Sequence, residues 1–456
     1  MKKNIDMVGG SLFPNIILYT IPIMLTGLLQ LLFNAADLVV VGRYSGSIAV
    51  AAVSATGAIT NLIVNLFMGL SVGAGVAVAH GMGSRNKDEV SKTVHTALPT
   101  ALIGGVLLTI VGVFFSKNFL QWMQTPDNVL PYSTIYMQIY FAGITFSMVF
   151  NFCSSILCAA GDSKSPLIYL TMAGIINVIL NLIFVVLFHM HVDGVALATT
   201  ISQGIACFFV VRTLQKRNDS CKFRFRNMHV YITQLKKIIR IGLPAGIQGS
   251  LFSISNVIIQ SSINSFNSEL IMSGNGAASN IEGFVYTSMN SFQQTAINFI
   301  GQNTGAQRYD RVRKVFRFCL LDVTVVGLVA GLSVFTFRES LLSIYLADSP
   351  AAIAQGSIRF FYVCMPYFLC GLMDVATGAL RGLGASLVPM IISVVGVCGF
   401  RIGWIYTIFR LPEYHTPQCL YISYPISWII TFICHVTAFE ILYHKRQKAV
   451  KQYSLQ

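Results

Sequence analysis

Charged residues are scarce in this sequence, and their scarcity limits what the protein can be. Only 11% of the 456 residues are charged, 54% are hydrophobic, and the mean hydropathy is +0.67. Soluble domains carry about 25% charged residues, so this composition excludes an ordinary soluble enzyme or binding domain. Acids are rarest, with 17 Asp and Glu against 31 Lys and Arg. An acid inside an apolar run is therefore a candidate functional residue.

Patterns typical of metal centres are also missing. The ten cysteines form no CxxC pair, and their spacing suits neither a metal site nor a disulfide framework. HExxH does not occur, and His189 and His191, which form an HxH pair, are interpreted as membrane-interface residues. His435 lies inside an apolar run without a second ligand beside it. The sequence therefore predicts no metal, no bound cofactor and no enzymatic activity.

Long apolar runs dominate the chain. Each has about the 20 residues that a spanning helix needs, or more. The twelve runs lie near residues 12–41, 48–78, 93–115, 131–158, 166–188, 192–214, 237–265, 271–300, 314–337, 354–380, 387–409 and 418–443. They predict an all-α polytopic membrane protein with twelve transmembrane helices.

The basic residues are distributed unevenly between the loops. If both termini lie on one side, the segments on that side hold 25 Lys and Arg, nine of them between Arg212 and Arg240. Only five belong to the other side, and Arg401 is assigned to the interior of a run; the five are Arg43, Lys117, Arg338, Arg359 and Arg410. The positive-inside rule then places both termini in the cytoplasm, in a multi-pass protein of the cytoplasmic (inner) membrane. This distribution also accounts for the net charge of +14 without nucleic-acid binding. Segment 212–240 could bind anionic lipid, although topology alone explains its charge.

The chain repeats itself. Pro22 and Pro244 are 222 residues apart, and Asn34 and Asn256 match at the same offset. Gly, Asp and Val stay in register between segments 83–90 and 305–312, and segment 161–166 resembles segment 384–389. The repeat predicts an N-lobe at 1–217, a cytoplasmic linker at 218–236 and a C-lobe at 237–456. Because each lobe has six spans, an even number, the two lobes are parallel repeats.

The first apolar run carries three polar residues on one helical face. Gln30, Asn34 and Asp37 are spaced by four and three residues. A carboxylate inside a membrane helix costs roughly 2.5–3.5 kcal/mol on insertion scales, so it usually lines a cavity or has a partner. The alternative is that Asp37 lies near the helix end and bonds only to neighbouring backbone.

Six sequence motifs resemble those of the prokaryotic multidrug and toxic compound extrusion (MATE) transporters. They are N-x-x-D-x-x-x-V-G-R-Y in the first run, G-x-G-S-R-N-K-D-E-V after the second, A-A-G-D-S-K-S-P after the fourth, D-G-V-A-L-A-T opening the sixth, G-Q-N-x-G-A-Q after the eighth and G-A-L-R-G-L-G after the tenth. The resemblance covers essentially the whole chain. It implies two six-helix bundles around a V-shaped cavity, acting as a monomer. It also implies an antiporter that exports small organic molecules, cationic or amphipathic, in exchange for H+ or Na+.

The resemblance also implies a cation-coupling site in the N-lobe. Carried over residue by residue, it consists of Asp37, Asn177, Asn181 and Thr199, with Asn34 nearby. The family often has an aspartate where this chain has Asn181. A single carboxylate with amide and hydroxyl neighbours favours proton coupling over tight sodium binding. The alternative is that the two asparagines only satisfy each other across a helix contact.

The C-terminal half has different chemistry. Ile259 occupies the position of the second repeat that corresponds to Asp37, and the acids of this half occur at other positions. The predicted substrate cavity is lined by six polar residues, namely Gln30, Asn256, Gln260, Glu282, Tyr286 and Asp374. Glu282 and Asp374 could also form a second cation site. The alternatives are an amide-paired packing role for Glu282 and a structural pair of Asp374 with Arg381 or Arg401.

Two prolines lie well inside predicted helices. Pro22 and Pro244 each remove a backbone hydrogen bond and permit a bend. We interpret them as hinges that could link cation binding at Asp37 to helix bending; a fixed kink is the alternative.

One rival function shares the predicted architecture. A flippase for lipid-linked oligosaccharides would need several arginines facing the cavity, to bind its anionic cargo. Because the sequence assigns only Arg401 to the interior of a span, we prefer the efflux transporter.

Overall fold

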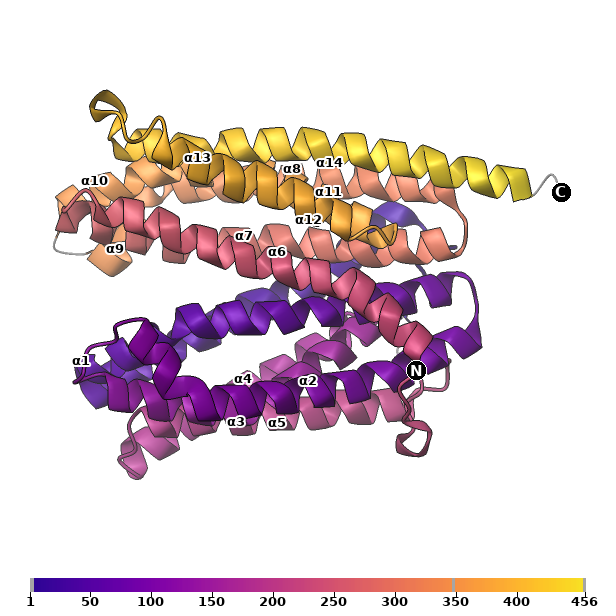
Figure 1. Ribbon diagram of the computed structural model, residues 1–456, viewed down its shortest axis with the longest axis horizontal. Coiled ribbons are helices and arrows are strands. Elements are labelled where there is room, and N and C mark those ends of the chain that lie inside the picture. Colours follow the sequence, from indigo (N-terminus) through magenta and orange to yellow (C-terminus); the bar gives the residue numbers. More distant parts are fainter. Residues whose placement is uncertain (1–3, 347–348, 454–456) are drawn as a thin grey trace. The chain divides into compact units, whose positions relative to one another are not determined.

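The computed structural model describes residues 4–346 and 349–453, and every regular element in these residues is helical (Figure 1). This confirms the predicted all-α class. The first half contains α1 (Leu12–Gly83), α2 (Lys87–Trp122), α3 (Leu130–Ala159), α4 (Lys164–Leu182) with the π-helical turn η1 (Ile183–Leu187), α5 (Val192–Lys216) and the 3-10 turn η2 (Phe225–Asn227). The second half contains α6 (Ile232–Asn264), α7 (Glu269–Gly305), α8 (Tyr309–Thr336), α9 (Arg338–Leu346), α10 (Pro350–Arg359) with η3 (Phe360–Cys364), α11 (Phe368–Gly382), α12 (Leu387–Ser393) with η4 (Val394–Gly399) and α13 (Phe400–Tyr406), η5 (Pro412–Tyr414) and α14 (Pro417–Tyr453).

The predicted apolar runs coincide with these helices. Gly46 has φ +81° and ψ 178°, which divides α1 into two spans, Leu12–Gly46 and Ile48–Gly83. Ten helices in the described residues are long and apolar enough to cross a membrane. An eleventh span is the pair Pro350–Cys364 and Phe368–Gly382, which is bent by 41°.

Helix α7 matches the remaining predicted run, at 271–300, but it is unusually polar. Its 37 residues exceed the length needed to span, while many of its buried side chains are polar. They include Asn275, Glu282, Gln293, Asn298, Gln302 and Asn303. Since lipid does not solvate such groups, α7 must bury most of its surface against other helices.

Two compact units make up the chain. Unit 1 contains Met1–Ile5 and Leu25–Ser250, and unit 2 contains Asp6–Met24 and Leu251–Gln456. The two long helices α1 and α6 each contribute one part to each unit. The predicted lobes, in contrast, follow the sequence repeat: the N-lobe keeps α1 whole, and the C-lobe contains all of α6 except its first five residues, which were assigned to the linker. Pro22 lies three residues before the residue at which α1 enters unit 1.

In unit 1, the first half of α6 packs tightly against the second span of α1. A β-carbon added at Gly69 would lie 2.1 Å from the backbone nitrogen of Gly246, and one added at Gly73 would lie 2.2 Å from the carbonyl oxygen of Ile238. Small residues spaced by four let two membrane helices approach this closely. The same stretch, Gly69–Gly73, matches the G-x-S-x-G pattern of hydrolases. Here it is helical, and the hydroxyl of Ser71 donates to a backbone carbonyl, so it is a packing motif and not a nucleophile elbow.

In unit 2, the start of α1 binds α7 through polar contacts. The hydroxyls of Thr20 and Thr295 are 2.8 Å apart, and the Asn298 amide donates to the Tyr19 hydroxyl at 2.9 Å. The Asn303 amide also donates to the Met7 carbonyl at 3.0 Å. These bonds account for part of the polar sequence of α7.

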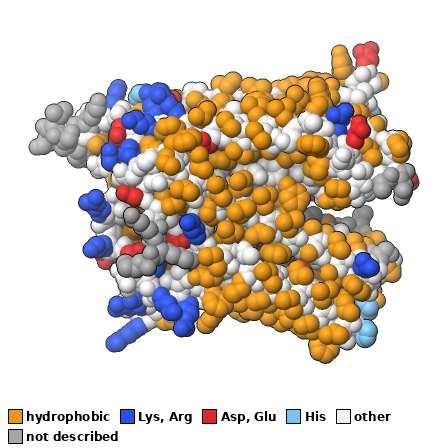
Figure 2. Space-filling view, turned by 180° about the vertical axis from the view of Figure 1, so that it is seen from behind, with side chains coloured by type: hydrophobic (Ala, Val, Ile, Leu, Met, Phe, Trp, Pro, Cys, Tyr) orange, Lys and Arg blue, Asp and Glu red, His pale blue; other side chains and the backbone are white. Residues whose placement is uncertain are grey.

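Each unit, taken by itself, has its Lys and Arg side chains mostly at one end of its helices (Figure 2). Hydrophobic side chains cover the flanks between the ends, and several are highly exposed, for example Phe114 at 75% and Leu187 at 68%. Apolar flanks of this kind are expected of a multi-pass membrane protein, because lipid covers them.

Candidate functional site

Asp37 of α1 is bound by side chains from two other helices of unit 1. Its Oδ1 accepts a hydrogen bond of 2.5 Å from the amide of Asn181 in α4. Its Oδ2 accepts from the hydroxyl of Thr199 in α5 at 3.5 Å. Asp37 therefore does not bond only to neighbouring backbone, which was the alternative interpretation.

Asn177, the remaining predicted residue of the cation site, contacts both Asn181 and Thr199. Asn177 accepts from the Asn181 amide at 3.3 Å and donates to the Thr199 hydroxyl at 3.3 Å. Asn177 and Asn181 are four residues apart, so α4 presents both to the same neighbours. They are 5% and 0% exposed, whereas Asp37 is half-buried. The asparagines thus contact each other and the acid, and the two interpretations of them are not exclusive.

A glycine in α4 permits this close approach of α1. The ring of Phe33 lies against Gly174, where an added β-carbon would be 1.8 Å from Phe33 Cε2. Phe33 is four residues before Asp37 on the same face of α1, and Gly174 is seven residues before Asn181. A larger residue at position 174 would therefore require the Phe33 ring, one turn from Asp37, to move.

Tyr136 of α3 was missed by the sequence analysis. It lies within electrostatic range of Asp37, and its ring stacks on Tyr140 with centroids 6.4 Å apart. Tyr136 and Tyr140 are one turn apart on α3, a polar-tipped pair within an apolar run. That spacing was the available signal, but nothing in the sequence indicates that α3 faces Asp37.

Two predicted residues of the first run lie outside this group. Gln30 and Asn34 share a helical face with Asp37, yet both are exposed. Asp37, Asn177, Asn181 and Thr199 therefore form the candidate site, which contains one acid, two amides and a hydroxyl. The described residues contain no group of three or more His, Cys, Asp or Glu side chains that could hold a metal ion.

Glu282, predicted to line the substrate cavity, is held in a buried ion pair in unit 2. Arg359 of α10 donates to its Oε2 through Nε at 2.8 Å, and Nη2 lies 2.7 Å from the same oxygen. Arg359 also donates to Asn275 at 2.7 Å and lies over the rings of Tyr421 and Tyr424, 5.5 Å from each centroid. The alternative interpretation, in which Glu282 pairs with amide side chains, was thus incomplete, because the main partner of Glu282 is the Arg359 guanidinium.

This pair corrects the assignment of arginines to loops. Arg359 was counted among the residues outside the spans, but it is 6% exposed and lies ten residues into the bent span that begins at Pro350. Arg381 is also buried, at 6%, near the end of that span, so Arg401 is not alone in the interior. The loop assignment failed because a pairing acid on another helix makes a buried arginine tolerable, which hydropathy does not detect.

Asp374 of α11 is 4% exposed and lies in a separate polar group of unit 2. Asn290 of α7 and Arg381 of α11 are polar neighbours of its carboxyl group, whose Oδ2 is buried without a hydrogen-bond partner among the described residues. Arg401 instead donates to Ser427 at 3.0 Å and lies over the Tyr424 ring at 3.9 Å. The contacts of Arg401 are thus with other groups, which favours Arg381 over Arg401 as the structural partner of Asp374.

The other predicted cavity residues of unit 2 are more accessible. Asn256, Gln260 and Tyr286 are exposed, and Gln260 bonds to Asn264 and Asn275 at 3.1 and 3.2 Å. The candidates in unit 2 thus divide into exposed side chains, which a substrate could reach, and buried acids with polar partners.

Comparison with known proteins gives consistent results for the whole chain. A family model described as MatE matches residues 22–183 and 244–407, two segments that begin 222 residues apart and confirm the predicted repeat. "Probable multidrug resistance protein YoeA" of Bacillus subtilis (strain 168) is 25% identical over 448 residues, covering 96% of this chain and 95% of that protein. "Probable multidrug resistance protein YpnP" of the same strain is 27% identical over 400 residues, covering 86% and 87%.

A solved structure shares the fold. The crystal structure of a MATE protein in complex with MaL6 superimposes with a TM-score of 0.90 at 20% identity, covering 99% of this chain and 100% of that one. The resemblance seen in the sequence motifs is thereby confirmed, as are the two repeats. Because the matching model covers both halves and more than half of all residues, the chain belongs to the MatE family.

Proposed function

We propose that this protein is a secondary active efflux transporter that exports organic molecules by alternating access, in exchange for cations bound at Asp37. The family consists of membrane transporters, so the prediction that the chain is not an enzyme is confirmed. The relatives described as multidrug resistance proteins support small organic molecules as the cargo.

The observation that carries the proposal is the set of partners around Asp37. The carboxylate lies within a span and receives hydrogen bonds from Asn181 and Thr199, but no described cation pairs with it. An acid inside a membrane helix is energetically costly unless a cation or a polar partner compensates its charge, so the presence of Asp37 here points to a cation-binding role. A structural role would be served at lower cost by an amide.

The donor set favours a proton over sodium. Sodium binds to oxygens, whereas Asn181 directs its amide nitrogen toward Asp37 and Thr199 donates its hydroxyl. The other amide oxygen, Asn181 Oδ1, is buried and has no hydrogen-bond partner among the described residues. If Asp37 takes up a proton, a rotation of the Asn181 amide would turn this oxygen toward the new donor. Asp37, next to an amide that can rotate to offer either its nitrogen or its oxygen, can therefore accept and release one proton without the several oxygen ligands that a metal ion needs.

Binding at this site could be transmitted through α1. Asp37 belongs to unit 1, whereas the part of α1 that precedes Leu25 belongs to unit 2. Pro22 lies just before that transition, where its missing hydrogen bond makes bending easier. We propose that Pro22, with Pro244 as its counterpart in α6, acts as a hinge during alternating access to a V-shaped cavity. Both termini would face the cytoplasm.

The substrate would be cationic or amphipathic. We propose that it contacts the exposed polar candidates, which are Gln30, Asn256, Gln260 and Tyr286. Glu282 is buried and paired with Arg359, so we assign it a structural role in this state. Asp374 is also buried, but its Oδ2 has no hydrogen-bond partner among the described residues, so we keep it as a candidate for a second cation site.

The rival flippase is less consistent with the buried arginines. Arg359 pairs with Glu282, Arg381 is a neighbour of Asp374, and Arg401 lies against Tyr424. All three arginines are buried within unit 2, at 5–6% exposure, so a large anionic cargo does not reach them in this structure.

The test is transport by purified protein in liposomes, with ethidium as a cationic probe. An imposed proton gradient should drive efflux by the wild type, and Asp37→Asn should reduce gradient-driven efflux to near background. The amide keeps the volume and hydrogen bonding of the acid but cannot exchange a proton. Asp127→Asn, which removes an exposed loop acid of unit 1, is the matched control and should transport normally. Coupled efflux at wild-type rates by a well-folded Asp37→Asn protein would reject the assignment.

A further inference from the structure

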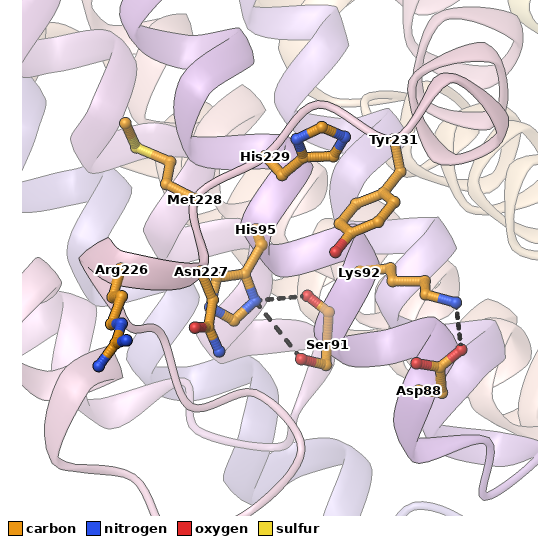
Figure 3. A pocket seen from close by; sticks show the side chains of 9 residues that line it. All are labelled: Asp88, Ser91, Lys92, His95, Arg226, Asn227, Met228, His229 and Tyr231. Atoms are coloured by element: carbon orange, nitrogen blue, oxygen red, sulfur yellow. Dashed lines mark hydrogen bonds and ion pairs between the residues drawn. The ribbon is translucent and has the colours of Figure 1, made fainter.

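A polar pocket in unit 1 is lined by residues other than those of the Asp37 site (Figure 3). Its volume is about 490 Å³, and it lies between the first turns of α2 and the segment that joins α5 to α6. The lining residues are Asp88, Ser91, Lys92, His95, Arg226, Asn227, Met228, His229 and Tyr231. Neither the cation site nor the proposed transport path uses them.

The wall of the pocket is held in place by specific hydrogen bonds. His95, which is 3% exposed, lies against the Ser91 carbonyl through Nδ1 at 2.8 Å and accepts from the Arg224 backbone N–H through Nε2 at 3.1 Å. The Thr96 hydroxyl accepts from the Tyr231 backbone N–H at 3.1 Å. The joining segment is therefore fixed to α2, and the pocket is a built feature rather than a gap under a loose loop.

Positive charge dominates the pocket. Lys92 forms an ion pair of 2.6 Å with Asp88, the one acid in the lining. This pair uses one of the three hydrogens of the Lys92 ammonium group. Arg226 and His229 are exposed at the rim. Arg224 is also exposed, next to the lining residues. This arrangement suits a phosphate group, which several N–H donors can bind at once.

Exposed apolar side chains flank the same pocket. Phe225 is 62% exposed, Met228 42% and Ile232 61%. Helices α2 and α6 begin at Lys87 and Ile232, and their apolar runs begin near residues 93 and 237, so the pocket lies beside the polar ends of two membrane-spanning helices. Basic residues next to exposed aromatic and aliphatic side chains are the composition expected of a surface lying in the lipid headgroup layer.

We propose that this pocket binds the phosphate of an anionic phospholipid. Lys92 and Arg226, whose side chains lie on opposite sides of the pocket in Figure 3, would turn inward to bind the phosphate oxygens, with Asn227 and His229 at the rim, while Phe225 and Ile232 contact the adjoining lipid. The apolar side chains favour lipid over a free phosphate ion, since a soluble anion would have no use for them. The site would attach the connection between the two halves of the sequence to the membrane surface.

The test compares short-chain lipids on detergent-purified full-length protein. Dioctanoyl phosphatidylglycerol, dioctanoyl phosphatidylcholine and inorganic phosphate are titrated while thermal unfolding and native mass spectra are recorded. We expect the wild type to bind the anionic lipid in preference to the other two. Lys92→Gln/Arg226→Gln should weaken this binding roughly tenfold or more, and high salt should do the same. Phe225→Ser/Ile232→Ser should weaken it without changing the charge.

The matched control removes two exposed lysines from the C-terminal part of α14. Lys445→Gln/Lys448→Gln has the same net charge as the double pocket variant and should retain wild-type binding. Arg226→Gln alone, at an exposed position, should fold normally and show an intermediate loss. Equal losses in the pocket and control variants would overturn the proposal. So would a free-phosphate effect as large as that of the lipid, or an unchanged affinity in both pocket variants.

Discussion

Replacing Arg359 by methionine removes the cation from the buried pair with Glu282 while keeping a long apolar side chain. Both partners are under 10% exposed, and three charged hydrogen bonds or contacts of 2.7–2.8 Å would be lost. Removing one partner of a buried ion pair costs about 3–5 kcal/mol, because the other charge stays buried alone. For a unit of roughly 200 residues, each kcal/mol lowers Tm by about 2–4 °C, so we expect a decrease of roughly 6–20 °C.

The assay is thermal unfolding of the purified protein, followed by intrinsic fluorescence. Glu282→Gln/Arg359→Met removes both charges and should be less destabilising than the sum of the single variants, since no unpaired charge remains. Glu339→Gln is the control, because that acid has a 77% exposed side chain and lies 3.7 Å from Arg338. Exposed pairs contribute about 0–1 kcal/mol, so its Tm should change little.

Two results would refute this reasoning. One is a Tm of Arg359→Met that matches that of the control. The other is additivity in the double variant, which would mean that the two side chains do not interact. Gradient-driven efflux by the double variant at wild-type rates would further establish that Glu282 is not a coupling acid.

Three other predictions concern the cation site and the topology. Asn181→Asp adds a second carboxylate, and because two acids in one site repel each other, efflux should become more dependent on sodium; identical rates with and without sodium would count against the site. Gly174→Val places side-chain atoms where the Phe33 ring lies, so coupled efflux should fall several-fold, at a stability cost of about 1–3 kcal/mol, and adding Phe33→Ala should restore part of it. In a background without the native cysteines, Thr233→Cys should resist an impermeant thiol reagent added outside intact cells, whereas Glu413→Cys should react; the reverse pattern would invert the proposed orientation.

The sequence alone was sufficient for the helices and for most of the candidate site. Apolar length is a local property, so each predicted run coincides with a helix, a joined set of helices, or one of the two spans of α1. Asn177 and Asn181 share a face because of helical periodicity, which is also local. That Asp37 and Thr199 join them came from the family resemblance, and the structure brings the four residues together.

Only the tertiary structure decided which distant side chains meet. Glu282 and Arg359 are 77 residues apart, and Asn181 and Asp37 are 144 residues apart, so neither contact follows from the pattern of a single helix. The sequence also gave no sign that α1 and α6 each contribute to both units. Periodicity and hydropathy describe one helix at a time, whereas partners on different helices depend on how the helices cross. That crossing is set by close contacts such as Phe33 on Gly174, which no single helix specifies.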